Sequence, residues 1–341
     1  DVLFFIRPND MISVELAMQA QKTGRLVVVM YDDDLLNLPK NIPFAPWRKK
    51  NMIKILEIAD VLVSSSQYLL NSYQSMFNIK RLGKVDTIVN ERDIFDFTPR
   101  KKEQVKIVYA AGPKHVELFN RFILPILPRL CQRYGKKLSL TCVGLYPNLE
   151  AFKDDIDIEI VESMPLAEYR KYMKDQQFDL GLAPLVTNNF TKCKYFNKYL
   201  EYTLVGIPGI YSETEPYTYV INNKVNGFLA KDTTDDWFTT ICEAIDDETL
   251  RKKCIQNAIN HVKHNFTAEE IGNNLVHDIP ELKEGVKNKK TQKKLYSKRY
   301  LYIVSRIADY VYLSYFYIKH SGIRGFTENA MIHIKERRNF K

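Results

Sequence analysis

Three charged residues follow a short apolar segment in the second half of the sequence. Lys194, Lys198 and Glu201 are spaced four and three residues apart, so a helix would place them on one face. The apolar residues at 180–185 predict a buried strand before that helix, and Gly206 predicts its end. Amines suit the oxygens of a diphosphate, and a carboxylate suits a pair of sugar hydroxyls. Because open α/β sheets bind ligands where strands give way to helices, this pattern predicts a nucleotide-diphosphate site. An exposed ladder of helical charges is the alternative.

Two glycine-containing turns could belong to the same site. The turn after the predicted strand at 106–110 contains three candidate residues: Gly112, Lys114 and His115. A glycine in this place can admit phosphate, although the sequence lacks the GxGxxG of dinucleotide-binding folds and a plain turn is the alternative. Gly144 ends the next predicted strand, where a nucleotide base would lie nearby. Since the carboxyl ends of parallel strands meet at one edge of a sheet, both turns are predicted to face one ligand.

Three consecutive carboxylates, Asp32 to Asp34, end the central strand predicted in the first half of the sequence. Carboxylate oxygens are ligands that Mg²⁺ favours, so a metal site is one interpretation. Adjacent residues of an extended segment point to opposite sides, however, which counts against a shared metal ion and leaves a solvated turn as one alternative. A role facing an acceptor is the other, implied by the resemblance of this stretch to a YD(I/D)DD segment of some GT-B glycosyltransferases. We therefore predict no metal site, and name Asp33 and His115 as the candidate catalytic residues.

The sequence around the charged group resembles a motif of the GT4-type bacterial glycosyltransferases. Residues 190–208, FTKCKYFNKYLEYTLVGIP, are similar to that family's FNxxKSxxKxxEYxxxGxP. The resemblance implies that Lys194 and Lys198 hold the diphosphate of a sugar donor and that Glu201 holds the ribose hydroxyls of its nucleotide. It also implies the α/β GT-B fold, in which two Rossmann-like domains with parallel sheets face each other across a cleft.

Two further turns are similar to turns of the same family. Residues 111–115 resemble its GSxxH turn, which implies that this segment closes over the donor phosphates. Glu213 and Tyr217 lie in a segment like its SxxxPY turn and are predicted to line the donor site, with plain loop polarity as the alternative. One position departs from the pattern. Many relatives carry a second glutamate where this chain has Cys193, which leaves the donor sugar open.

Short apolar strands alternate with helical patterns through most of the chain, as in parallel α/β sheets. Residues 90–104 interrupt the alternation with charge and without periodicity. We therefore predict an acceptor-side Rossmann-like domain at 1–103, a nucleotide-sugar-binding one at 104–284, and a basic, Tyr-rich helical tail at 285–341. The first domain is short, as if truncated before its opening strand and helix. The predicted elements include a strand at 85–89 and helices at 116–134 and 194–205.

The positive charge of the chain is concentrated in its tail. Residues 285–341 contain 14 Lys and Arg and 3 Asp and Glu, a net charge of +11. Because the whole chain carries +9, residues 1–284 carry 9 − 11 = −2. A fold that bound nucleic acid would carry the charge itself, so we expect no nucleic-acid partner. Tyrosines and aliphatic residues at helical spacing follow the lysines. They predict either a helix at a membrane interface or a helix that packs back on the body.

Together these features predict a glycosyltransferase that moves a sugar from a nucleotide-diphosphate donor of open base to a glycan or lipid-linked acceptor. By resemblance, the setting is bacterial cell-surface polysaccharide synthesis, and the enzyme is a hexosyltransferase that retains configuration without a metal ion or cofactor. An inverting reaction would need a base such as Asp33. A non-catalytic GT-B-like subunit that partners an active glycosyltransferase is the alternative. Widely spaced cysteines and the lack of a signal-peptide pattern predict a cytoplasmic protein, peripheral on the inner face of the membrane through its tail.

Overall fold

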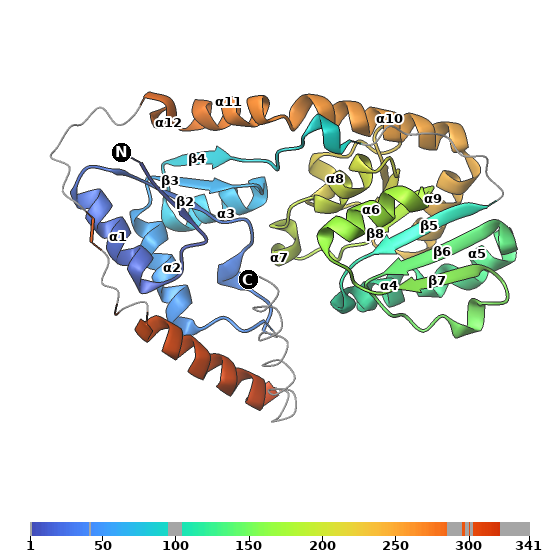
Figure 1. The fold of residues 1–341 in the computed structure, drawn as a ribbon, viewed down its shortest axis with the longest axis horizontal. Coiled ribbons are helices and arrows are strands. Elements are labelled where there is room, and N and C mark those ends of the chain that lie inside the picture. The colour runs from blue at the N-terminus through green and yellow to red at the C-terminus, as the bar shows by residue number, and fades with distance from the viewer. Residues whose placement is uncertain are drawn as a thin grey trace. The chain divides into compact units, whose positions relative to one another are not determined.

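The computed structural model describes residues 2–40, 42–94, 104–284, 295, 296, 300 and 303–320 of the chain. They belong to two compact units (Figure 1), which we call unit 1 and unit 2. Unit 1 consists of Asp1–Val85 with Asn274–Lys341, and unit 2 consists of Asp86–Asn273. The chain therefore enters unit 2 once and then returns to unit 1.

Unit 1 is built on a four-stranded parallel sheet whose strands lie in chain order. The strands are β1 (Val2–Ile6), β2 (Leu26–Met30), β3 (Val61–Ser64) and β4 (Arg81–Lys84). Its described helices include α1 (Met11–Lys22), η1 (Leu35–Asn37), α2 (Pro46–Ile58), α3 (Gln67–Phe77) and α12 (Glu281–Glu284). Polar residues begin two of these helices, since Asp10 accepts the N–H of Ser13 at 2.9 Å and Ser66 accepts that of Leu69 at 3.3 Å.

The core of unit 1 is completed by residues from near the end of the described body. Ile279 is fully buried against valines of β2 and β3. A side chain at Gly83 would place its Cβ 3.3 Å from Ile279, so a glycine in β4 gives this isoleucine room. Arg81 of β4 pairs with Glu281 at 2.7 Å beside it. The segment after residue 273 is thus part of the packing of unit 1.

Residues 303–320 form a further helix, the unlabelled dark red one in Figure 1, which we call the tail helix. One of its faces contacts α2, where Asp309 accepts hydrogen bonds from Trp47 Nε1 at 3.3 Å and Arg48 Nε at 2.8 Å. This corresponds to the packing alternative for the tail. Among the described residues, no helix combines the length and the apolar character needed to cross a membrane. Most other residues of the predicted tail lie outside the described part of the chain.

Unit 2 is built on a six-stranded parallel sheet of order β10-β9-β8-β5-β6-β7. Its strands are β5 (Val105–Ala110), β6 (Leu138–Val143), β7 (Asp157–Val161), β8 (Leu180–Ala183), β9 (Gly209–Ser212) and β10 (Phe228–Ala230). The order reverses after β7, because the chain crosses back to β8 beside β5. A reversal of this kind creates the crevice at which open α/β sheets bind ligands.

The helices of unit 2 cover both faces of this sheet. They are α4 (Val116–Phe122), α5 (Leu127–Tyr134), α6 (Leu166–Gln176), α7 (Asn189–Lys192), α8 (Asn197–Leu204), α9 (Thr234–Asp246), α10 (Glu248–Asn265) and α11 (Ala268–Asp278), the last of which continues into unit 1. Short 3₁₀ turns are η2 (Glu91–Asp93), η3 (Pro113–His115), η4 (Leu124–Ile126), η5 (Gly135–Lys137), η6 (Glu150–Phe152) and η7 (Tyr217–Tyr219). The core joins α4, α5 and α9 to one face. Right-handed crossovers place α6 and α8 on the other.

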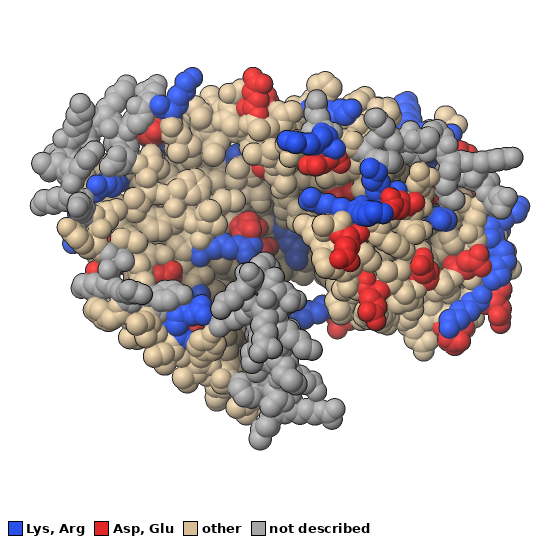
Figure 2. Space-filling view, viewed as in Figure 1, with Lys and Arg blue, Asp and Glu red and all other residues tan. Residues whose placement is uncertain are grey.

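Basic and acidic side chains lie among one another over unit 2 on the face that Figure 2 shows. Three arginines of α4 and α5 pair with aspartates at or before α9: Arg121 with Asp232, Arg129 with Asp235, and Arg133 with Asp246. Exposed pairs of this kind contribute roughly 0–1 kcal/mol each, so they shape the charge of the surface more than its stability.

The predicted strand at 85–89 is wrong. The fourth strand of unit 1 is β4, and the chain leaves the sheet after the N–H of Val85 bonds to Ser64 O at 3.1 Å. Within the described part of the chain β4 pairs only with β3, so it is an edge strand, and edge strands tolerate polar residues. A search for apolar runs therefore overlooks β4, whose sequence is Arg-Leu-Gly-Lys, and selects the more apolar residues that follow it.

Two predicted helices are interrupted in the structure. The one at 116–134 divides into α4, η4 and α5, because Pro125 and Pro128 have no N–H to continue the helical bonding. The one at 194–205 is replaced by α7 and α8. Asn188 begins α7 early by accepting the N–H of Thr191 at 2.9 Å, and α7 ends at Lys192. Lys194 therefore lies in the turn before α8, so the expectation that it shares a helical face with Lys198 is wrong.

The unit boundaries differ from the predicted ranges 1–103, 104–284 and 285–341 at both ends. Residues 86–94 belong to unit 2, where the N–H of Val89 bonds to Phe266 O at 2.8 Å. Residues 274–284 belong to unit 1, because Ile279 completes its core. Both boundaries are set by packing between residues far apart in the sequence, and the amino-acid composition gives no signal of that packing.

Candidate functional site

The predicted donor-site residues of unit 2 follow four neighbouring parallel strands. These strands are β9, β8, β5 and β6, in that order across the sheet. Because all of them run in the same direction, their carboxyl ends lie at one edge. The segments after them contain, in the same order, Glu213, Lys194, Gly112 and Gly144.

The two glycines serve different purposes. Gly144 is buried with a φ of +78°, and a Cβ there would lie 2.6 Å from Ala111 O, so only glycine lets the turns after β5 and β6 approach this closely. Gly112 is exposed with a φ of −72°, and a Cβ there would have nothing within 4 Å. The backbone at Gly112 and the exposed Lys114 beside it are therefore accessible to a ligand.

Glu201 on α8 is the centre of a compact polar group. Its Oε2 accepts a hydrogen bond from the Tyr169 hydroxyl at 3.2 Å and pairs with Lys198, one turn earlier on α8. Lys198 Nζ also lies 3.5 Å from the Tyr169 hydroxyl. Within the described part of the chain both bonds end on Oε2 and none on Oε1. The second oxygen of Glu201 is thus available to accept a hydrogen bond from a hydroxyl group of a ligand.

His115 lies within the electrostatic reach of the two lysines. Burial lowers the pKa of His115 below its ordinary value, and the charges of Lys194 and Lys198 lower the pKa further. Its imidazole is therefore neutral at pH 7. Lys194 itself stands over the Phe190 ring, with Nζ 5.3 Å from the centroid. The structure thus brings together the turn after β5 and the lysines after β8.

Glu213 and Tyr217 take different places in the segment after β9. Glu213 is exposed, and its N–H bonds to Ala230 O at 2.7 Å, which ties the segment to β10. Tyr217 is buried, with its ring 4.9 Å from that of Tyr211. Burial raises the pKa of Tyr217, and the charge of Glu201 raises the pKa further. Tyr217 is therefore a buried side chain within electrostatic reach of Glu201, while Glu213 is exposed to solvent.

Asp33 lies in unit 1, apart from all these residues in the chain. Arg7 forms an ion pair with Asp32 and a longer contact of 3.3 Å with Asp33. Asp34 has a structural role, since it caps η1 and accepts a hydrogen bond of 2.8 Å from the Tyr73 hydroxyl. The three neighbouring carboxylates are thus divided between an arginine and a helix cap. In the described ranges, no three His, Cys, Asp or Glu side chains gather as ligands of a metal ion.

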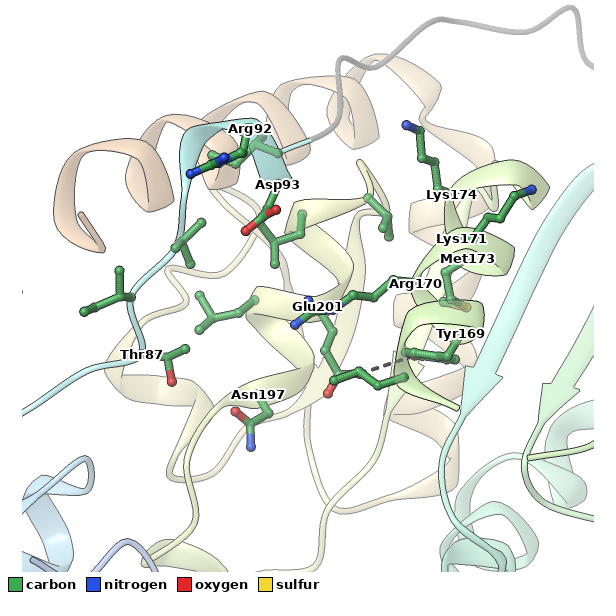
Figure 3. A pocket seen from close by; sticks show the side chains of 17 residues that line it. Thr87, Arg92, Asp93, Tyr169, Arg170, Lys171, Met173, Lys174, Asn197 and Glu201 are labelled. Atoms are coloured by element: carbon green, nitrogen blue, oxygen red, sulfur yellow. Dashed lines mark hydrogen bonds between the residues drawn. The ribbon is translucent and has the colours of Figure 1, made fainter. Parts of the chain in front are cut away.

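Sequence reasoning missed Tyr169. Figure 3 shows it on α6, facing Glu201 across one side of a pocket of about 530 Å³. The pocket is lined by α6, by α8 and by the segment at 87–94. Tyr169 and Glu201 are separated by 32 positions. The available signal was its place at the start of α6, the helix after β7, a strand for which no site residue was predicted.

No protein-family model matches the sequence, and no curated protein matches it either. Solved structures do resemble the molecule. The sucrose-phosphate synthase of Thermosynechococcus elongatus aligns with a TM-score of 0.58 at 12% identity, over 84% of this chain and 74% of that one. TarM aligns at 0.56 and 8% identity, over 81% of this chain and 54% of its own length. The Anabaena protein HepE, solved with UDP, aligns at 0.53 and 13% identity, over 79% and 76%.

These three proteins are GT-B glycosyltransferases. The chain has the GT-B fold. Its two parallel sheets, of four and six strands, are the cores of two Rossmann-like GT-B units, which confirms the fold implied by the motif at 190–208. The likeness is one of fold, and this GT-B chain spans about half the length of TarM.

Proposed function

We propose that this chain is a glycosyltransferase that moves a sugar from a nucleotide-diphosphate donor to a glycan or lipid-linked acceptor. The observation that carries the proposal is the group on α8. Glu201 is held by Tyr169 and Lys198 on one oxygen, with the other open, at the ligand-binding edge of a GT-B unit. A carboxylate fixed in this way suits the two vicinal hydroxyls of a ribose.

The donor's diphosphate has suitable partners in the same unit. Lys194 and Lys198 influence the pKa of His115, so three nitrogen-bearing groups lie within electrostatic range of one another. The positive charges of the two lysines neutralise charge on a leaving diphosphate, the task that a metal ion performs in other phosphate sites. The open backbone at Gly112, with Lys114 beside it, allows close approach of phosphate oxygens. Gly144 shapes the neighbouring turn.

The transfer step needs little acid–base chemistry from the protein if it retains configuration. The acceptor hydroxyl then attacks from the side on which the diphosphate leaves, and a phosphate oxygen takes its proton. The neutral His115 can donate one hydrogen bond to the donor without competing for that proton. An inverting transfer would instead need a carboxylate base, for which Asp33 in unit 1 is the candidate.

The setting we propose is cell-surface polysaccharide synthesis at the cytoplasmic side of a bacterial membrane. The resemblance of residues 190–208 to the GT4-type motif supports it. HepE has been solved with UDP-glucose, and TarM with UDP and α-GlcNAc-glycerol. Uridine is accordingly the first base to test, with glucose and N-acetylglucosamine as the first sugars.

A thermal-shift panel of UDP, GDP, TDP and CMP tests the site and identifies the base together. We expect one nucleoside diphosphate to raise the melting temperature of the 341-residue chain, and Glu201→Gln to lose most of that shift. Glu243→Gln is the matched control, because Glu243 pairs with Lys224 at 2.8 Å elsewhere in unit 2. The proposal is overturned if no nucleotide shifts the melting temperature at millimolar concentration, or if both variants behave alike.

A non-catalytic subunit is the second candidate, and Cys193 is the observation that favours it. This residue is 1% exposed, where many relatives have a glutamate that contacts the transferred sugar. Release of free sugar from the bound donor, measured alongside binding, separates the two functions. Turnover supports the transferase, whereas tight binding without turnover supports the subunit.

A further inference from the structure

The tail helix, residues 303–320, has one face fixed against unit 1. Asp309 is 9% exposed and forms an ion pair with Arg48 of α2. The Tyr312 ring packs edge-on against Trp47, with centroids 5.4 Å apart, and Phe316 is also 9% exposed. These three tail residues are at spacings of three and four, so they define one side of the helix. The rotation of the helix about its axis is therefore set.

The opposite face of the tail helix carries an exposed apolar stripe. Its members are Ile303 at 55%, Val304 at 58%, Ile307 at 59%, Val311 at 66%, Tyr315 at 60% and Ile318 at 46% exposure. At 100° per residue they fall within about 120° of the helix circumference. Single exposed apolar residues are ordinary on a protein surface, but a continuous stripe on a helix marks an interaction site.

The charge around the stripe decides between a lipid surface and a second copy of the chain. In the tail helix, the acidic residue Asp309 forms its ion pair with Arg48. The basic residues of the same helix are Arg306 and Lys319. The sequence just before it, at 285–299, contains seven Lys and Arg and no Asp or Glu. Two copies joined through their stripes would bring the cations of both tail helices together, at an electrostatic cost. An anionic lipid surface would instead attract them.

We propose that the stripe of the tail helix docks this protein on an anionic lipid bilayer. The 18 residues of the helix span about 27 Å, and they would lie along the interface. Aliphatic side chains of the stripe then enter the acyl region, and Tyr315 occupies the headgroup boundary, which suits its amphipathic ring. Because Asp309 and Tyr312 hold the helix on α2, docking would place unit 1 itself at the membrane surface. This docking requires no transferase activity.

Vesicle flotation of the 341-residue chain tests this proposal without an activity readout. The vesicles contain phosphatidylcholine alone or with about 30% phosphatidylglycerol, which supplies the anionic surface. The variant Ile307→Ser/Val311→Ser removes the middle of the stripe. The matched control is Met76→Ser/Val225→Ser, which alters two side chains exposed at 54% and 48% outside the tail helix. Thermal melts confirm that each variant is folded.

We expect the parent chain and the control to float with the anionic vesicles, and the stripe variant to bind at least about tenfold more weakly. Binding should fall with added salt, because the lysines contribute through charge. Equal binding of parent and stripe variant would overturn the proposal, as would failure of the parent to float. A parent dimer in analytical ultracentrifugation that the stripe variant abolishes would also overturn it, since the stripe would then be a self-association surface.

Discussion

Replacing Tyr169 by phenylalanine tests how the proposed ribose site is organised. The change removes a hydrogen bond of 3.2 Å to Glu201 Oε2 and leaves the ring in place. Hydrogen bonds to charged groups contribute about 1.5–3 kcal/mol. Glu201 is 36% exposed and keeps its pair with Lys198, so solvent and that amine reduce the expected effect to about 1 kcal/mol. A loss of this size weakens nucleotide binding about fivefold.

Isothermal titration with UDP measures this change, and the same helix offers a matched control. Tyr172 of α6 donates to Glu159 Oε2 at the same distance of 3.2 Å, away from Glu201. Tyr172→Phe should therefore leave the Kd within about twofold of the parent. For 2′,3′-dideoxy-UDP, which lacks the hydroxyls assigned to Glu201, all three proteins should bind equally. If Tyr169→Phe weakened both ligands to the same extent, the tyrosine would have no role in positioning Glu201 for ribose.

Three further outcomes follow from the same edge of unit 2. Lys198→Met should weaken UDP binding at least about tenfold by titration and uridine binding by a smaller factor, because its amine serves the diphosphate and also holds Glu201. Gly144→Ala should lower the urea-unfolding free energy by about 2 kcal/mol, since its φ is +78°, whereas Gly112→Ala should change it by less than about 0.5 kcal/mol. Burial lowers the folded pKa of His115, so the unfolded chain binds the extra proton and stability should decline as the pH falls below about 6.5. His115→Gln should reduce that decline in urea titrations at pH 5 and pH 7, and an unchanged slope would contradict the assignment.

The strands of the molecule were predictable where they are apolar. Val27, Val28 and Val29 of β2 are fully buried, and an uninterrupted apolar run of this kind indicates a strand covered on both faces. β4 escaped prediction because an edge strand needs no apolar run. The turn before α8 escaped it because the cap at Asn188 starts α7 early, and the charges at 194 and 198 have helical spacing whether or not both lie on a helix.

The contacts of the candidate site were also predictable only in part. Lys198 and Glu201 are three residues apart, so local helical geometry alone predicts their ion pair. Tyr169 reaches the same carboxylate from a different helix, and Tyr217 lies within its electrostatic reach, which depends on how α6, α8 and the segment after β9 pack. Contacts of this kind are set by tertiary structure and leave no periodic pattern in the sequence.

The return of the chain to unit 1 has a consequence for biosynthesis. When a ribosome has released residues 1–85, the valines of β2 and β3 still lack Ile279, which emerges almost two hundred positions later. Unit 2 is continuous and can fold in the meantime. We therefore expect unit 1 to remain an incompletely folded intermediate with exposed apolar residues until then. Nascent chains stalled before residue 274 should accordingly bind chaperones longest.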